Sequence, residues 1–160
     1  QKFDTGEDFN VRSATSEAHT KLSLADTNSL RPMGTTIVGL ILDQQNAEFF
    51  NLGDSRAYKF NKMNLIQITK DDVSNSNRRN VVNQCLGGGI SLPTPNIFYC
   101  EYKKGDTFLL ISDGISGFLS KDEIYRIMQS GDPKLSSRLC AEAVKSGSSD
   151  DISAIVIECR

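Results

Sequence analysis

The sequence predicts an α+β domain, in which strands in antiparallel order are accompanied by helices. The middle of the chain holds several apolar, β-branched segments of strand length, separated by short polar turns. Segments with a three- and four-residue apolar period open the chain and also follow the strands. At 160 residues, with 38% hydrophobic and 24% charged side chains, the chain is long enough for one globular domain with its own core. Two or more packed layers are therefore expected.

Residues 11–24 are predicted to form the first helix, because their apolar side chains recur at three- and four-residue steps. These side chains are Val11, Ala14, Ala18 and Leu22. Asn10 stands where an N-cap is expected. His19 lies in the middle of this helix, where a histidine is more often a core or surface residue than a ligand. Residues 26–32 break the period with polar residues and a proline, which predicts a loop.

Seven segments have the length and composition of strands. They are residues 35–42, 47–52, 56–60, 65–69, 97–102, 107–111 and 152–157. The segments at 47–52, 56–60 and 65–69 follow one another closely, which predicts an antiparallel meander. Between the strand at 65–69 and the one at 97–102, residues 79–86 are predicted to form a short helix, stopped by the glycines at 87–89.

Two helices are predicted after the strand at 107–111. Ser120 and Glu123 have the spacing of a capping box, which marks the start of the first of them. The second is expected over residues 133–144, with Pro133 in its first turn. Its apolar face is Leu135, Leu139 and Ala143.

Charge and cysteine usage exclude several classes of protein. The chain carries 18 basic and 20 acidic side chains, spread over both halves, so it lacks the basic face of a nucleic-acid-binding protein. Its longest apolar run, residues 37–42, is far shorter than the roughly 20 residues of a membrane helix, and no secretory leader is recognised. Four cysteines without a close pair argue against a zinc site and a disulfide framework. They are Cys85, Cys100, Cys140 and Cys159. The first three stand among apolar residues, so buried, reduced thiols are expected there, in a cytoplasmic protein.

Three aspartates stand at the ends of predicted strands. Asp113 follows the strand at 107–111, Asp150 precedes the strand at 152–157, and Asp54 lies at the junction of two strands. If the first two strands run antiparallel in one sheet, the end of one and the start of the other lie at the same rim. We therefore expect Asp113 and Asp150 to converge, with Asp54 within reach of the same rim.

Clustered carboxylates repel one another unless positive charge lies between them, and Mg²⁺ or Mn²⁺ meets that need because both ions prefer carboxylate oxygens. Taken one at a time, each aspartate also fits a plain turn or cap residue, and Asp54 fits an internal ion pair with Arg56. In a purely structural β domain, the spacing of the three aspartates would be accidental.

Several segments, in order along nearly the whole chain, resemble the metal-dependent serine/threonine protein phosphatases of type 2C, the PPM family. Residues 33–36 read MGTT and residues 53–56 read GDSR, as in two strand openings of that family. The other matching segments are TKDD at 69–72, RNV at 79–81 leading to LG at 86–87, LLISDGI at 109–115 and GSSDDIS at 147–153. Each short segment is weak by itself, whereas the ordered set is specific.

This resemblance implies an antiparallel β-sandwich flanked by helices, the PPM-type phosphatase fold. It implies two Mg²⁺ or Mn²⁺ ions at one end of the sandwich and direct attack of an activated water on phosphoserine or phosphothreonine, without a phosphoenzyme. By the same resemblance, Asp113 and Asp150 are metal ligands, and Asp54 helps to hold a third, weaker ion.

The residues depart from the family pattern in three places. The family's acidic pair and DG-(H/M)-G-G segment should precede MGTT, and residues 4–8 do not supply them. The aspartate that bridges both ions and its neighbouring histidine are therefore expected to be missing, and His19 does not replace them. Asp72 stands where histidine is usual, and Asp151 where asparagine is usual. We expect residues 1–160 to form a single, partial phosphatase domain, N-terminally incomplete, with an incomplete metal site.

The function expected from the resemblance is metal-dependent hydrolysis of phosphoserine and phosphothreonine in proteins, by a hydrolase that acts in signalling through dephosphorylation. The alternative is a non-catalytic PPM-like regulatory or phosphoprotein-binding module. The expected cofactor is Mg²⁺ or Mn²⁺. The expected partners are phosphorylated Ser/Thr proteins, with neither nucleic acid nor membrane, and the complete protein is expected to be a monomer.

Overall fold

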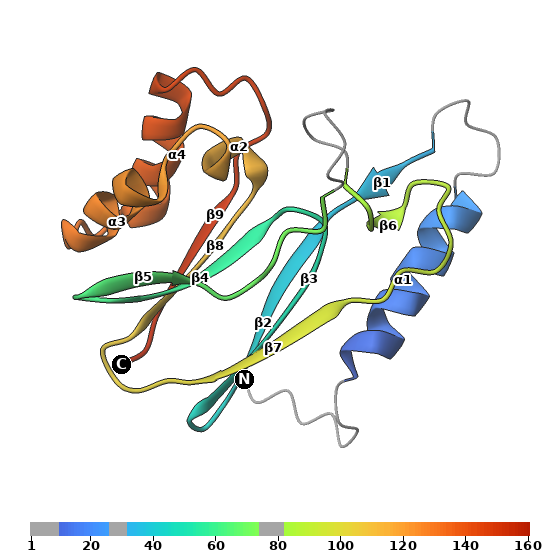
Figure 1. The fold of residues 1–160 in the computed structure, drawn as a ribbon, viewed down its shortest axis with the longest axis horizontal. Coiled ribbons are helices and arrows are strands. Elements are labelled where there is room, and N and C mark those ends of the chain that lie inside the picture. The colour runs from blue at the N-terminus through green and yellow to red at the C-terminus, as the bar shows by residue number, and fades with distance from the viewer. Residues whose placement is uncertain (1–9, 26–31, 74–81) are drawn as a thin grey trace.

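The structure, a computed structural model, describes residues 10–25, 32–73 and 82–160 (Figure 1). Its helices are α1 (Val11–Ala25), α2 (Asp113–Ser116), α3 (Lys121–Gln129) and α4 (Leu135–Lys145). Its strands are β1 (Gly34–Thr35), β2 (Ile37–Asp43), β3 (Asn46–Leu52), β4 (Arg56–Asn61), β5 (Asn64–Gln67), β6 (Leu86–Gly87), β7 (Asn96–Glu101), β8 (Thr107–Ile111) and β9 (Ala154–Glu158).

The strands form antiparallel sheets, which confirms the predicted fold class. A four-stranded sheet has the order β5-β4-β8-β9, a three-stranded sheet has the order β2-β3-β7, and the short strands β1 and β6 pair with each other. Helices α2, α3 and α4 lie together beside the four-stranded sheet, and α1 lies beside β6 on the other side of the molecule (Figure 1).

Strand β8 supplies side chains to two separate cores. Phe108 and Leu110 point toward the three-stranded sheet, where Phe108 meets Phe49 edge-on with ring centroids 5.2 Å apart. Leu109 and Ile111 point the other way, into the core beneath the helices. The alternation of side chains along a strand therefore explains why β8 is apolar at successive positions: both of its faces are buried.

Helices α3 and α4 close the second core. Their apolar faces, which include Ile124 and Leu139, are buried against the four-stranded sheet. Ser120 and Glu123 form the predicted capping box at the start of α3. Helix α4 begins at Leu135, so Pro133 precedes the helix instead of lying in its first turn.

Helix α1 begins as predicted, with the Asn10 side chain accepting a hydrogen bond from the Ser13 amide at 3.0 Å. Its most buried positions are Val11, Thr15 and His19, with the predicted alanines beside them. His19 is a core residue: its Nδ1 accepts a hydrogen bond from the backbone amide of Gly87 at 3.1 Å, which joins α1 to β6.

Two predictions about this part of the chain are wrong. The expected meander does not form, because β3 belongs to the three-stranded sheet whereas β4 and β5 belong to the four-stranded one. The chain changes sheet at residues 53–55. In the described part of the segment at 79–86, no helix forms, and Leu86 instead pairs with Thr35 in the β1–β6 ladder. Residues 79–81 and most of the predicted loop at 26–32 lie outside the described residues.

All four cysteines are free thiols, as predicted, but each is only half-buried. Within the described ranges, none of the helices combines the length and the apolar content that a bilayer crossing requires.

A buried ion pair joins Lys59 of β4 to Asp106, in the turn between β7 and β8. Lys59 Nζ lies 2.9 Å from Asp106 Oδ2 and also donates to the carbonyl of Glu101 at 2.7 Å. The backbone amide of Lys103 donates to the same carboxylate. Burial raises the pKa of Asp106, but the hydrogen bonds from Lys59 and Lys103 outweigh burial, so its pKa lies below the ordinary value.

We predict that Asp106→Asn lowers the free energy of unfolding by about 2–3 kcal/mol at pH 7, because it leaves the Lys59 ammonium without its partner. The folded-state pKa of Asp106 is lowered, so its stabilisation is present above the ordinary value of 3.8 and is lost as the pH falls through the folded-state pKa. Urea denaturation at several pH values measures this. The control is Asp132→Asn, which removes an exposed pair with Arg138 at 3.7 Å and should cost under about 1 kcal/mol. Equal losses in the two variants would contradict the role given to Asp106.

Candidate metal site

The three aspartates singled out in the sequence lie at one end of the four-stranded sheet. Arg56 of β4 pairs with Ile111 of β8, and Ile111 pairs with Ala154 of β9. Asp54 comes two residues before Arg56, Asp113 two residues after Ile111, and Asp150 four residues before Ala154. The antiparallel pairing expected from the sequence is therefore present, and it brings all three strand ends to the same rim.

Asp54 sits in the turn at which the chain changes from one sheet to the other. Gly53 has φ +97°, and a Cβ there would lie 2.4 Å from Thr36 Cγ2, so only glycine fits. The hydroxyl of Thr36 is hydrogen-bonded to the hydroxyl of Ser55 at 2.9 Å. This bond joins the MGTT segment to the GDSR segment at the residue that follows Asp54.

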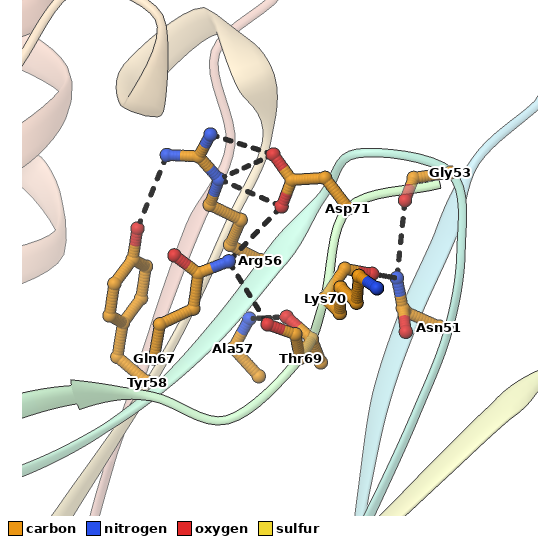
Figure 2. Close-up of polar contacts among 9 residues, drawn as sticks. All are labelled: Asn51, Gly53, Arg56, Ala57, Tyr58, Gln67, Thr69, Lys70 and Asp71. Carbon is orange, nitrogen blue, oxygen red and sulfur yellow. Dashed lines mark hydrogen bonds and ion pairs between the residues drawn. The ribbon is translucent and has the colours of Figure 1, made fainter. Parts of the chain in front are cut away.

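The segment after β5 holds this turn in place. Arg56 donates to both carboxylate oxygens of Asp71, with Nη2 2.7 Å from Oδ2, and Gln67 donates to the same carboxylate (Figure 2). The Ala57 amide donates to the Thr69 hydroxyl at 2.9 Å. Hydrogen bonding to Asp71 raises the pKa of Arg56, so the guanidinium stays charged.

Asp72 and Asn51 contact the backbone of Gly53, at the start of the turn. Asp72 accepts hydrogen bonds from the Gly53 amide and, at 2.9 Å, from the Asn96 side chain, while its own amide donates to the Gly53 carbonyl. The fully buried Asn51 donates to the carbonyls of Gly53 and Lys70 (Figure 2). Asp72, where the family usually has histidine, thus acts here as an acceptor for the turn.

Asp54 and Asp113 belong to neighbouring strand ends at this rim, before β4 and after β8. Burial raises the pKa of Asp54, and the negative charge of Asp113 raises it further. Both residues are half-buried, whereas Asp150 is exposed and accepts a hydrogen bond from the amide of Asp151 at 2.8 Å. Among the residues that the structure describes, no three acidic, cysteine or histidine side chains gather closely enough to hold an ion by themselves. Asp54 and Asp113 are therefore brought together, and Asp150 shares only their rim.

The sequence reasoning missed the supporting residues of this site. Asp71, Asn51 and Asn96 were not singled out, because each acts through contacts between segments far apart in the chain. The only sequence signal for Asp71 was its place in the TKDD segment at 69–72, which does not predict its contact with Arg56.

The model of one protein family, described as Protein phosphatase 2C, matches residues 5–145 of this chain. The chain belongs to the protein phosphatase 2C family. This confirms the resemblance drawn from the ordered motifs. Asp54 and Asp113 lie within the matched residues.

Relatives of this protein phosphatase 2C chain include bacterial phosphatases. The chain is 29% identical over 150 residues to the serine/threonine phosphatase stp of Listeria monocytogenes, with 81% of this chain and 58% of that protein covered. It is 28% identical to the serine/threonine protein phosphatase PstP of Mycobacterium tuberculosis, of which 28% is covered. The chain thus spans little more than half the length of the Listeria protein.

Solved structures share the fold. The serine/threonine phosphatase Stp1 of Staphylococcus aureus superposes with a TM-score of 0.81 at 23% identity, covering 93% of this chain and 66% of that one. The phosphatase PstP/Ppp of Mycobacterium tuberculosis superposes with a TM-score of 0.76 at 25% identity, covering 91% and 68%.

We predict that Arg56→Lys lowers the free energy of unfolding by about 1–2 kcal/mol, because lysine cannot reproduce the two-pronged contact with Asp71. Chemical denaturation measures the loss. Arg12→Lys, an equivalent change at an exposed position of α1, is the control and should leave stability within about 0.5 kcal/mol of the parent. An unchanged stability in Arg56→Lys would show that the Arg56–Asp71 contact does not hold the segment after β5.

Proposed function

We propose that the protein containing this chain hydrolyses phosphoserine and phosphothreonine in proteins, with Mg²⁺ or Mn²⁺ held at the rim of the four-stranded sheet. The observation that carries the proposal is the aligned register of β4, β8 and β9, which places Asp54, Asp113 and Asp150 at one rim of a protein phosphatase 2C fold. The names of the bacterial relatives support the same reaction.

The donor set fits a hard divalent cation. The negative charge of Asp113 adds to burial in raising the pKa of Asp54, and carboxylate oxygens are the ligands that Mg²⁺ and Mn²⁺ prefer. Such ions usually keep several waters, so two or three carboxylates with water and further ligands suffice.

In this proposal Asp113 and Asp150 are ligands, and Asp54 helps to hold a further, weaker ion at the same rim. A divalent ion held there supplies a water of lowered pKa and positive charge against the transferring phosphoryl group. The surrounding backbone keeps the carboxylates in place, since Asp54 is held by the turn at 53–55 and Asp113 by the start of α2. The exposure of Asp150 leaves the rim open to a phosphorylated side chain on a protein surface.

The remaining assignments belong to the same proposal. Residues 1–160 form a single, partial phosphatase domain. The substrates of the complete protein are phosphorylated Ser/Thr proteins in the cytoplasm, and the complete protein acts as a monomer and binds neither nucleic acid nor membrane. The absence of a basic face in the sequence supports the exclusion of nucleic acid.

We predict that Asp113→Ala and Asp150→Ala, made in the full-length protein, each lower Mn²⁺-dependent hydrolysis of p-nitrophenyl phosphate and of a phosphothreonine peptide by at least about 100-fold, since ligand loss should exceed the effect of losing an outer partner. Asp122→Ala, at an exposed position of α3, is the matched control and should retain activity. Retained turnover in Asp113→Ala or Asp150→Ala would remove that residue from the site. A parent protein that binds the phosphopeptide without hydrolysing it would favour the non-catalytic module.

We also predict that Mn²⁺ raises the melting temperature of the full-length protein, because an ion bound only by the folded state stabilises it, by about 2.7 kcal/mol at a hundredfold excess over Kd. The shift should shrink in Asp113→Ala. Thermal unfolding with Mn²⁺ and after treatment with a chelator measures this, and an identical melting temperature in both conditions would argue against a metal site.

A further inference from the structure

Serine hydroxyls join the start of α2, which carries Asp113, to the loop before β9, which carries Asp150. Ser112 is the N-cap residue of α2, with extended backbone, yet its side chain makes no capping hydrogen bond. Instead, its hydroxyl accepts a hydrogen bond from the Ser153 amide at 3.0 Å and donates to the Asp151 carbonyl at 3.3 Å. An N-cap serine normally satisfies the first amides of its own helix, so the Ser112 hydroxyl is diverted here to the neighbouring loop.

A second hydroxyl makes a similar connection a few residues away. Ser148 donates to the carbonyl of Gly114 at 2.9 Å. The two segments also approach closely at Gly114, where a Cβ would lie 2.5 Å from the Asp151 carbonyl oxygen. Asp150 therefore lies between two residues that are hydrogen-bonded to the neighbours of Asp113. Ser148 is bonded to Gly114, and Asp151 is bonded to Ser112.

Packing alone does not fix this loop. Ile152 packs against the core beneath the helices, but Asp150, Asp151 and Ser153 are exposed, and Asp150 lies four residues before Ala154, the first paired residue of β9. Exposed loops with few apolar contacts open easily unless polar contacts restrain them. The Ser112 amide donates to the Ser153 carbonyl at 3.1 Å, and the hydroxyl hydrogen bonds of Ser112 and Ser148 further restrain this loop on the side of Asp113.

We propose that Ser112, assisted by Ser148, is a positioning residue that sets the separation of Asp113 and Asp150 and thereby tunes the affinity for a divalent cation. The inference rests on the proposed function for the identity of the ligands. Ser112 does not touch the ion in this proposal. It acts through the backbone of residues 151 and 153, which follow directly on Asp150.

The test compares Ser112→Ala with its parent in the full-length protein. Calorimetric titration with Mn²⁺ should show the dissociation constant raised about tenfold, as for other outer partners of metal ligands. The Mn²⁺ concentration for half-maximal phosphatase activity should rise by a similar factor, with kcat recovered at saturating Mn²⁺. Ser112→Thr keeps the hydroxyl and should restore parental Mn²⁺ affinity. Ser149→Ala, an exposed serine of the same loop, is the matched control and should leave Mn²⁺ affinity unchanged.

Parental Mn²⁺ affinity in Ser112→Ala, or weak affinity in Ser112→Thr, would overturn the proposal. If Ser112→Ala does not fold, Ser148→Ala tests the same proposal, because it removes the hydrogen bond to the Gly114 carbonyl. Unchanged Mn²⁺ affinity in Ser148→Ala would also overturn the proposal. A parent protein that binds Mn²⁺ but hydrolyses no phosphopeptide contradicts the proposed function, while weakened binding in Ser112→Ala still supports the role of Ser112. A parent that binds no Mn²⁺ overturns both.

Discussion

The register of β8 between β4 and β9 is the constraint on which the rest of this structure depends. Phe108 and Leu110 face one core and Leu109 and Ile111 face the other, so a slip by one residue would exchange every side chain between two differently shaped cores. The register is therefore strongly specified by packing. Because Ile111 is fixed opposite Arg56 and Ala154, the strand ends that lead to the three aspartates are brought to the same rim.

Beyond the strand ends, the backbone that carries the aspartates is held mainly by polar contacts, whereas the strands themselves are held by apolar packing. The turn around Asp54 is held by Asp72, Asn51 and the hydroxyl pair of Thr36 and Ser55. The loops around Asp113 and Asp150 are held by serine hydroxyls and backbone groups. A rim that must present carboxylates to solvent cannot be covered by apolar side chains, so hydrogen bonds provide the order there. The buried carbonyl oxygen of the Asn51 side chain, which has no hydrogen-bond partner among the described residues, lies in this polar region.

Local pattern was sufficient to predict the elements that are decided locally. The capping box of Ser120, the N-cap Asn10 and the strand at Thr107–Ile111 were all predicted from short segments and are confirmed. The shared rim of Asp113 and Asp150 was also predictable, because it needed only one assumption, that two apolar strands pair antiparallel. Long-range choices could not be predicted in this way. The short segment at 53–55, between β3 and β4, fits a hairpin turn and a change of sheet equally well. Only packing of the strands against the two cores determines which of the two forms. Leu86 forms a strand because Thr35 is available as a partner, and the short apolar segment itself cannot show that. For the same reason the contacts of Asp71 and Asp72, which join segments some fifteen to twenty-four residues apart, were not foreseen.

The double burial of β8 has a thermodynamic consequence. One face of β8 packs against the helices and the other face packs against the three-stranded sheet. If the helices detached, the helix-facing side chains of β8 would be exposed to water, and the strand that supports the other core would be destabilised. The two layers should therefore lose structure in a single cooperative transition, with the β8 amides among the slowest to exchange with solvent.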